Sequence, residues 1–264
     1  MKLHPMIAAL RRHKAGVVLI GLQIALTLAI VCNAVFIIGQ RVSRVNRPTG
    51  LDESNLMLVT QSWVGAPSGD QPGDVDKLDS MMQADLAALR AMPDVASVAP
   101  INSLPLLNSS WNGSVSLKAG TELREGNART TYYFTDDQAF RTLGLKLVAG
   151  RAFTPTDVQH RGFRDPSHPP VVIVTKALAD KLFPHGDALG KTIFLDGGST
   201  PSTIIGEVDR LQVPGTGSWT NSFTWYATLV PTRLDSGFSR YAVRAKPGRL
   251  DAVMRAVPQV LYGV

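Results

Sequence analysis

The longest apolar stretch of the chain covers residues 15–40 and contains no charged residue. About 20 apolar residues in a helix, each rising 1.5 Å, cross a hydrocarbon core of roughly 30 Å. The stretch is therefore long enough to span a membrane. The alternative is a buried helix of a soluble domain, but such helices are usually shorter and carry a polar stripe.

Two kinds of processed leader also contain apolar segments. A cleavable signal peptide has an apolar core of roughly 7–15 residues and a small-residue cleavage site. This stretch is longer, and no A-x-A motif stands at its end. A lipoprotein signal would place a small residue directly before the cysteine, whereas Val31 precedes Cys32. We therefore predict an uncleaved transmembrane helix.

Four small or polar residues, Gly21, Ala25, Ala29 and Asn33, recur at every fourth position of this helix. They would lie on one helix face, where small residues allow another helix to approach and an asparagine can form an interhelical hydrogen bond. We predict a membrane-helix packing face, with chance spacing in an alanine-rich segment as the alternative. The sequence contains no second long apolar run, so the partner helix would belong to another subunit or to a part missing from this sequence.

After a polar stretch, short apolar runs alternate with segments of helical periodicity. The patterns predict strands at 55–63, 95–99, 114–119, 132–134, 145–148, 170–174, 192–195, 202–208, 224–230 and 241–244. They predict helices from Asp74 to the stop at Pro93 and over 136–143, 175–183 and 250–257. Strands outnumber helices in an irregular order, which favours an α+β fold, a mixed α/β domain of two subdomains, over a doubly wound sheet.

The resulting organisation has four parts. We predict a cytoplasmic N-terminal segment over residues 1–14, a transmembrane helix over 15–40, a linker over 41–54 and an extracytoplasmic domain over 55–264.

The chain of 264 residues has a formal charge of +6, but this charge is unevenly distributed. Residues 1–47 hold seven Lys and Arg and no acidic residue, whereas residues 48–264 hold 20 basic and 21 acidic residues. The basic residues therefore flank the apolar helix, where they meet lipid headgroups, and they leave no footprint for nucleic acid. Four basic residues before the span and three after it favour a cytoplasmic N-terminus only weakly.

The segment from Tyr132 to Arg210 carries a series of short motifs. In order, they are an aromatic pair before a short helix, G-R-x-F-T-x-x-D, a V-V-I-V strand, an A-L-A-x-x-L-F-P helix end, an L-G-K-T turn and an I-G-x-V strand. In order and spacing, the segment resembles the periplasmic core domain of MacB-like ABC transporter permeases. The opening LRRHKAGVVLIGLQIALTLAI resembles the family's first membrane helix more loosely.

The motif positions are interpreted as structural rather than chemical. They are Gly150, Arg151, Phe153, Asp157, Leu182, Phe183, Gly190 and Lys191. Gly150 is expected to form a turn, Phe153 to anchor in the core, and Asp157 to cap a loop together with Thr154. Leu182 and Phe183 are expected on the buried face of a helix.

The resemblance implies the permease component of an ABC transporter of the export or mechanotransmission type. We expect this chain to be a single-pass protein of the bacterial inner membrane, and the resemblance implies that its periplasmic domain couples a separate ATP-binding subunit to a substrate or to a periplasmic adaptor protein. It implies membrane lipid as a partner and a homodimer or permease pair. It implies no enzymatic activity of this chain, no cofactor and no nucleic acid.

The family also has three FtsX-like membrane helices after the core domain, and this sequence has none. We therefore expect a truncated or split permease or a fragment of one. The alternative is a single-span, membrane-anchored binding module of the periplasm without transport activity. An anchored hydrolase is the weakest hypothesis.

Two groups of residues resemble chemical motifs without matching them. The segment from Gly186 to Thr192 has three residues between its glycines, whereas a phosphate-binding P-loop has four, and it follows a predicted helix instead of a strand. His160 and His168 lie near Asp157 and Asp165 in a proline-rich segment. These residues could in principle bind a metal, but no two of them form a ligand pair at helical spacing. We therefore interpret the histidines as solvated loop residues and predict neither a metal site nor a catalytic site.

Overall fold

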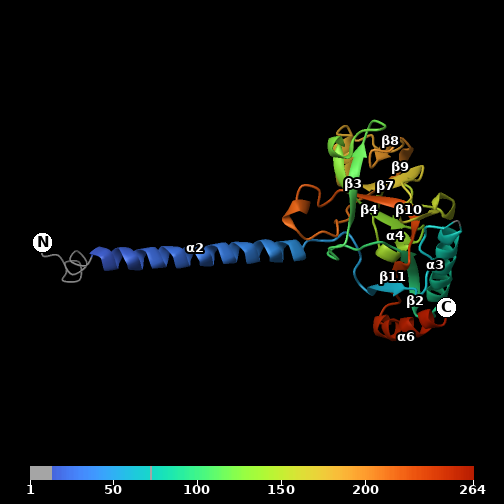
Figure 1. Ribbon diagram of the computed structural model, residues 1–264, viewed down its shortest axis with the longest axis horizontal. Coiled ribbons are helices and arrows are strands. Elements are labelled where there is room, and N and C mark those ends of the chain that lie inside the picture. Colours follow the sequence, from blue (N-terminus) through green and yellow to red (C-terminus); the bar gives the residue numbers. More distant parts are fainter. Residues whose placement is uncertain (1–13, 72) are drawn as a thin grey trace. The chain divides into compact units, whose positions relative to one another are not determined.

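The computed structural model describes residues 14–71 and 73–264, so most of the predicted N-terminal segment lies outside the described residues. The chain forms two compact units that divide between Arg47 and Pro48. The described part of the first unit is one helix, α2 (Lys14–Val45), drawn in blue in Figure 1. None of its residues is buried. The helix therefore lacks the packing of a core helix, and its length and composition are those of a membrane span.

The second unit, residues 48–264, is called the core domain below. Its elements in chain order are β1 (Leu56–Ser62), α3 (Asp74–Ala91), β2 (Val95–Pro100), β3 (Trp111–Ser116), β4 (Ala128–Thr135), α4 (Ala139–Leu143), β5 (Leu147–Gly150), β6 (Gln159–Gly162), β7 (Val171–Thr175), α5 (Lys176–Leu182), β8 (Thr192–Leu195), β9 (Pro201–Val208), β10 (Ala227–Asp235), β11 (Phe238–Ala245) and α6 (Leu250–Tyr262).

The smaller of the two sheets has the strand order β1-β11-β2, with all pairs antiparallel. Helices α3 and α6 pack against it at the lower end of the domain in Figure 1. The amphipathic spacing of α3 brings Met82, Leu86 and Leu89 into one apolar cluster with residues of β11 and α6. This cluster is the core of the smaller sheet.

The larger sheet has the strand order β4-β3-β8-β9-β7-β10-β6, with β5 attached to β9. Strand β4 also pairs with β10, which closes the path into a ring from β4 through β3, β8, β9 and β7 to β10. The buried positions of β9 alternate along the strand, as expected where one face of a strand meets a core. Helix α5 covers this core with Leu178 and Leu182.

Strands β10 and β11 carry the chain from the larger sheet to the smaller one. Asp235 ends β10 and Phe238 begins β11, with a turn of two residues between them. A third apolar cluster draws on both sheets, because it joins Tyr133 of β4 and Leu229 of β10 to Ala242 of β11. The two sheets therefore share part of their hydrophobic core, and the core domain is one compact unit.

The structure confirms an apolar N-terminal helix followed by a mixed α/β domain, and it corrects three details. Strand β6 lies in a segment for which the sequence predicts a loop. The segment lacks hydrophobic alternation, and it forms a strand because it pairs with β10. Strand β10 continues past residue 230 to Asp235 through the same pairing. Helix α6 continues through Pro258 to Tyr262, because Val257 and Leu261 still bury their side chains.

Residues 48–54, which belong to the predicted linker, make hydrogen bonds within the core domain. The Gln212 amide donates to the Thr49 carbonyl at 2.8 Å, and the Asp52 amide donates to the Leu143 carbonyl at 3.0 Å. Arg244 donates to the Asp52 side chain and to its carbonyl at 3.1 and 2.6 Å. These contacts attach the segment after Arg47 to the domain.

Candidate functional site

A cavity of about 520 Å³ opens where the smaller sheet, the larger sheet and the β10–β11 turn meet. Its walls combine four aromatic rings with a few polar side chains, and they include Trp111, Phe134, Phe163, Phe238, Asn102 and Arg240. An apolar concave surface with a small number of polar groups is typical of a site for a small molecule. We call it the aromatic cavity.

The aromatic rings of this cavity are held by one another and by a buried arginine. The centroid of Trp111 lies 5.1 Å from that of Phe134, edge to face, and 5.0 Å from that of Phe163. The guanidinium of Arg161 lies 5.1 Å from the Phe134 ring centroid, within cation–π range. Arg161 donates to the Ser167 carbonyl at 2.7 Å and also to the Asp165 carbonyl. Burial lowers the pKa of Arg161.

A second cavity, of about 550 Å³, adjoins the first and shares Phe163, Ser236 and Phe238 with it. Its walls include His160 of β6 and Asp235 at the end of β10. We call it the polar cavity, because charged residues such as Asp70, Arg164 and Asp165 join the two shared phenylalanines in its walls. The turn between β10 and β11 thus separates an apolar and a charged part of one hollowed surface.

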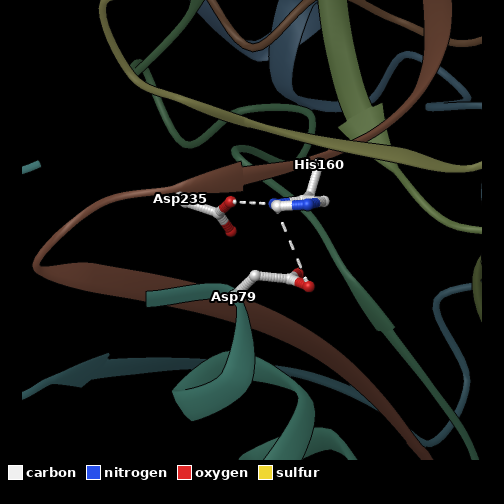
Figure 2. A group of neighbouring side chains, drawn as sticks. All are labelled: Asp79, His160 and Asp235. Carbon is white, nitrogen blue, oxygen red and sulfur yellow. Dashed lines mark hydrogen bonds and ion pairs between the residues drawn. The ribbon is translucent and has the colours of Figure 1, made fainter. Parts of the chain in front are cut away.

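Three side chains from three different elements meet beside the polar cavity, as Figure 2 shows: Asp79 of α3, His160 of β6 and Asp235 of β10. His160 Nδ1 lies 3.0 Å from Asp235 Oδ2 and 4.0 Å from Asp79 Oδ2. The pairing of Arg233 with His160 and of Asp235 with Gly162 aligns β6 with the end of β10. We call the three residues the Asp–His cluster.

The two carboxylates of the cluster have different environments. Arg233 binds Asp79 with two hydrogen bonds, at 2.6 and 3.0 Å, and Gln83 donates to the same carboxylate at 2.5 Å. Burial opposes ionisation of Asp79, but the Arg233 hydrogen bonds outweigh it and lower the pKa of Asp79. Burial raises the pKa of Asp235 to about 7, although the hydrogen bond from His160 opposes this and the charge of Asp79 adds to it.

The prediction that His160 and His168 are solvated loop residues beside Asp157 and Asp165 is wrong in one respect for His160, which is exposed as predicted but lies on a strand instead of a loop. His160 lies on β6, and its carboxylate neighbours are Asp79 and Asp235, which are distant in sequence. His168 lies outside the Asp–His cluster, with its ring centroid 6.4 Å from that of Tyr132. Burial lowers the pKa of His168.

Sequence reasoning missed Asp79 and Asp235, although a weak signal existed for both. Asp79 directly follows Leu78 at the edge of the apolar stripe of α3, where a buried acid needs a partner. Arg233 and Asp235 alternate along β10, so they share one face of the strand. The neighbouring strand β6 could not be identified from its residues, so His160 could not be placed beside them.

The predicted packing face lies on α2, away from these cavities in sequence and in a different compact unit. Gly21, Ala25, Ala29 and Asn33 all belong to the continuous helix and are exposed. A Cβ atom at Gly21 would meet nothing within 4 Å among the described residues, so no other described residue covers the packing face at this position.

The structure places the family-motif residues at turns and in the core. Gly150 has a φ of 75°, and a Cβ there would lie 2.2 Å from the Ile205 carbonyl oxygen. Arg151 and Asp157 form an ion pair at 2.6 Å, and Asp157 also accepts the Thr154 amide at 2.8 Å in a capping box. The Arg151 hydrogen bond and the capping contacts lower the pKa of Asp157.

The remaining motif residues serve α5 and the turn after it. Phe153 and Leu182 are buried, and Phe183 packs against the core of the larger sheet. The Gly190 amide donates to the Ile204 carbonyl at 2.8 Å, and Lys191 pairs with Asp187 at 3.0 Å on the surface. These eight positions lie outside the Asp–His cluster and outside the walls of both cavities.

The chain thus combines one helix that is long and apolar enough to cross a membrane with a mixed α/β domain. The model of the MacB-like periplasmic core domain matches residues 16–260. The chain belongs to this family of periplasmic domains of ABC-type transporter permeases.

Curated relatives include proteins with the name macrolide export ATP-binding/permease protein MacB. The protein from Bartonella henselae is 29% identical over 158 residues, which are 58% of this chain and 20% of that protein. The protein from Hahella chejuensis is 29% identical over 182 residues, which are 67% of this chain and 24% of that protein. The chain therefore spans about a fifth to a quarter of the length of these relatives.

The solved structures that match the chain include two extramembrane domains. The periplasmic region of MacB from Actinobacillus actinomycetemcomitans matches with a TM-score of 0.48 and 18% identity, covering 84% of this chain and 88% of that one. The extracellular domain of the noncanonic ABC-type transporter YknZ matches with a TM-score of 0.47 and 17% identity, covering 69% of this chain and 82% of that one.

Proposed function

We propose that this chain is a membrane-anchored permease component of an ABC transporter of the export or mechanotransmission type. The observation that carries the proposal is the continuity of the family match, which begins at residue 16 within α2 and ends at residue 260 within α6. The apolar helix and the core domain thus belong to one matched unit.

We further propose that ATP hydrolysis takes place in a separate ATP-binding subunit. The relatives' names combine ATP-binding and permease functions, and this chain matches about a fifth of the Bartonella henselae protein. The proposed partners are this subunit, membrane lipid, a second permease chain and a periplasmic adaptor protein. The domain boundaries 1–14, 15–40, 41–54 and 55–264 are part of the proposal, with residues 15–40 in the membrane and the core domain in the periplasm.

The topology has a direct test. Alkaline phosphatase fused after Val264 should be active in a bacterial host, because the enzyme folds only outside the cytoplasm, and green fluorescent protein fused at the same position and exported unfolded should stay dark. The reverse pattern would place the core domain in the cytoplasm and contradict the proposed localisation.

The partnership is tested by purifying the affinity-tagged, full-length gene product from membranes of its own host in mild detergent. An ATP-binding subunit should co-purify in a fixed ratio and should be lost when α2 is replaced by an unrelated membrane helix. If no ATP-binding protein accompanies the wild-type chain, the permease assignment is wrong.

The aromatic cavity favours a second candidate function, a single-span binding module without transport activity. Its rings and polar groups suit a small molecule of mixed polarity. The two functions differ in their dependence on ATP. A binding module would hold its ligand equally well with and without the ATP-binding subunit, whereas a permease component would release it when ATP is added to the assembly.

A further inference from the structure

We propose that Asp79, His160 and Asp235 form a binding site for a divalent transition-metal ion of the zinc class. The three side chains each offer a ligand atom, and these atoms lie within 4.8 Å of one another. Bonds of about 2.0–2.2 Å in a tetrahedral site separate neighbouring ligand atoms by roughly 3.3–3.6 Å. The distances of 3.0 and 4.0 Å from His160 Nδ1 to the two carboxylates bracket this separation.

A second observation points to a missing ligand. The side chain of Asp235 is completely buried, and its Oδ1 atom has no hydrogen-bond partner among the described residues. In Figure 2, both of its oxygens point toward the side on which His160 and Asp79 lie. A buried carboxylate oxygen without a donor is costly, and a cation placed between the three residues would satisfy it.

The charges around the cluster leave room for a dication. Among the described residues, the ion pairs of the Asp76, Asp79 and Asp235 carboxylates involve one guanidinium, that of Arg233, and the imidazole of His160. With the imidazole neutral and the carboxylates ionised, the forms in which these groups bind a metal, three negative charges and one positive charge leave a net charge of −2. One divalent ion balances this charge.

The donor set selects the kind of metal. One imidazole nitrogen with two carboxylate oxygens suits zinc, whereas calcium and magnesium prefer sites made of oxygen alone. His160 Nε2, the ring atom turned away from the cluster, lies 3.7 Å from Asp76 Oδ1. A carboxylate near the second ring nitrogen is the usual support for a metal-bound histidine.

The surroundings provide support and access. The fork of Arg233 and the amide of Gln83 hold the Asp79 carboxylate in position: Oδ2 accepts two of these hydrogen bonds and Oδ1 accepts one, so Oδ1 keeps a lone pair for a further contact. His160 and Asp235 also line the polar cavity, which gives an ion and its water ligand a path from the solvent. The alternative is a network of hydrogen bonds and ion pairs that needs no metal, and the test must separate the two.

The test uses the full chain, purified in detergent with a tag free of histidine and stripped with a chelator. Isothermal titration with zinc chloride should show one site per chain with micromolar affinity. The variants His160→Gln and Asp235→Asn should each weaken binding at least about tenfold. His185→Gln, at a histidine outside the cluster, is the matched control and should bind zinc like the wild type. Calcium and magnesium should not compete.

Cobalt provides a measurement that does not depend on stability. Bound at a tetrahedral site, Co²⁺ should give strong visible absorption bands in the wild type and in His185→Gln, and these bands should be lost in His160→Gln. Three results would overturn the proposal: zinc affinity unchanged in His160→Gln, no zinc binding by the wild type, or equal affinity for calcium. If Asp235→Asn fails to fold, the result for His160→Gln still decides the test, because a substitution at the exposed His160 should leave the fold intact.

Discussion

Arg90 of α3 donates to the carboxylate of Asp136, directly after β4, at 2.6 Å. The same guanidinium donates to the Val98 carbonyl of β2 at 2.9 Å. One side chain thus ties the helix and the smaller sheet to the end of a strand in the larger sheet. Burial raises the pKa of Asp136, and the charge of Arg90 opposes this. The ionised form of the Asp136 carboxylate is therefore stabilised by Arg90.

The first prediction concerns this pair. Removing one partner of a buried ion pair costs roughly 3–5 kcal/mol, but the Arg90 side chain is partly exposed and water screens part of the loss. We expect Arg90→Met to lower the free energy of unfolding by about 2 kcal/mol, measured by urea unfolding of the full chain in detergent. Arg141→Met, at an exposed arginine of α4, is the control. Equal stability of the two variants would show that the Arg90 pair does not join the sheets.

A second prediction concerns Asp85, which accepts a hydrogen bond from the Tyr241 hydroxyl at 2.9 Å. Burial raises the pKa of Asp85 above its ordinary value of 3.8. Its contribution to stability is therefore fully present below pH 3.8 and is lost as the pH rises through the raised pKa. The folded chain thus holds the Asp85 proton more tightly than the unfolded chain does, and ionisation at neutral pH works against folding.

The variant Asp85→Asn stays neutral and avoids this loss. We expect it to be more stable than the wild type at pH 7 and to match the wild type near pH 3, in unfolding curves recorded across this range. Glu125→Gln, at an exposed carboxylate, should follow the wild type. A variant less stable than the wild type at pH 7 would mean that Asp85 is stabilised as an anion.

The third prediction tests a turn of the family motif. Gly150 has a positive φ, and a Cβ there would clash with the Ile205 carbonyl. We expect Gly150→Ala to destabilise the core domain by more than about 2 kcal/mol, because the clash adds to the conformational cost of roughly 1–2 kcal/mol. Gly186 has a similar φ but nothing within 4 Å of its Cβ position, so Gly186→Ala should cost only about 1 kcal/mol. Thermal unfolding of both variants measures the difference, and equal losses would exclude the clash.

The fourth prediction concerns the packing face of α2. A leucine at Ala25 or Ala29 should prevent close approach of a partner helix, whereas Ala34→Leu, on the opposite side of the helix, should not. An interhelical hydrogen bond in a membrane contributes about 0.6 kcal/mol on average, and a leucine that keeps the helices apart should break the bond expected from Asn33, so we expect association to weaken about threefold or more. Energy transfer between labelled chains in liposomes measures this. The same loss in all three variants would contradict a specific face.

The sequence predicted the parts of the fold that rest on continuous local patterns. The membrane helix, α3 and strands such as β8 follow from their own apolar spacing, and the structure has them within a few residues of the predicted bounds. Strand β6 could not be predicted, because Gln159 and its neighbours form a strand only through pairing with β10.

The same reason hid the Asp–His cluster. Asp79, His160 and Asp235 are far apart in sequence, and only the parallel pairing of β6 with β10 and the packing of α3 bring them together. The family motif, in contrast, was visible as a series of short local patterns. Its residues mark turns and core positions, and the cavities lie elsewhere.

The central claim is that the core domain and its helix couple to ATP hydrolysis by another subunit. The most direct measurement is the ATPase rate of the ATP-binding subunit in proteoliposomes, alone and together with the full chain. We predict that the chain changes the rate, that Ala29→Leu abolishes this change, and that Ala34→Leu preserves it. An identical rate with and without the chain would contradict the account.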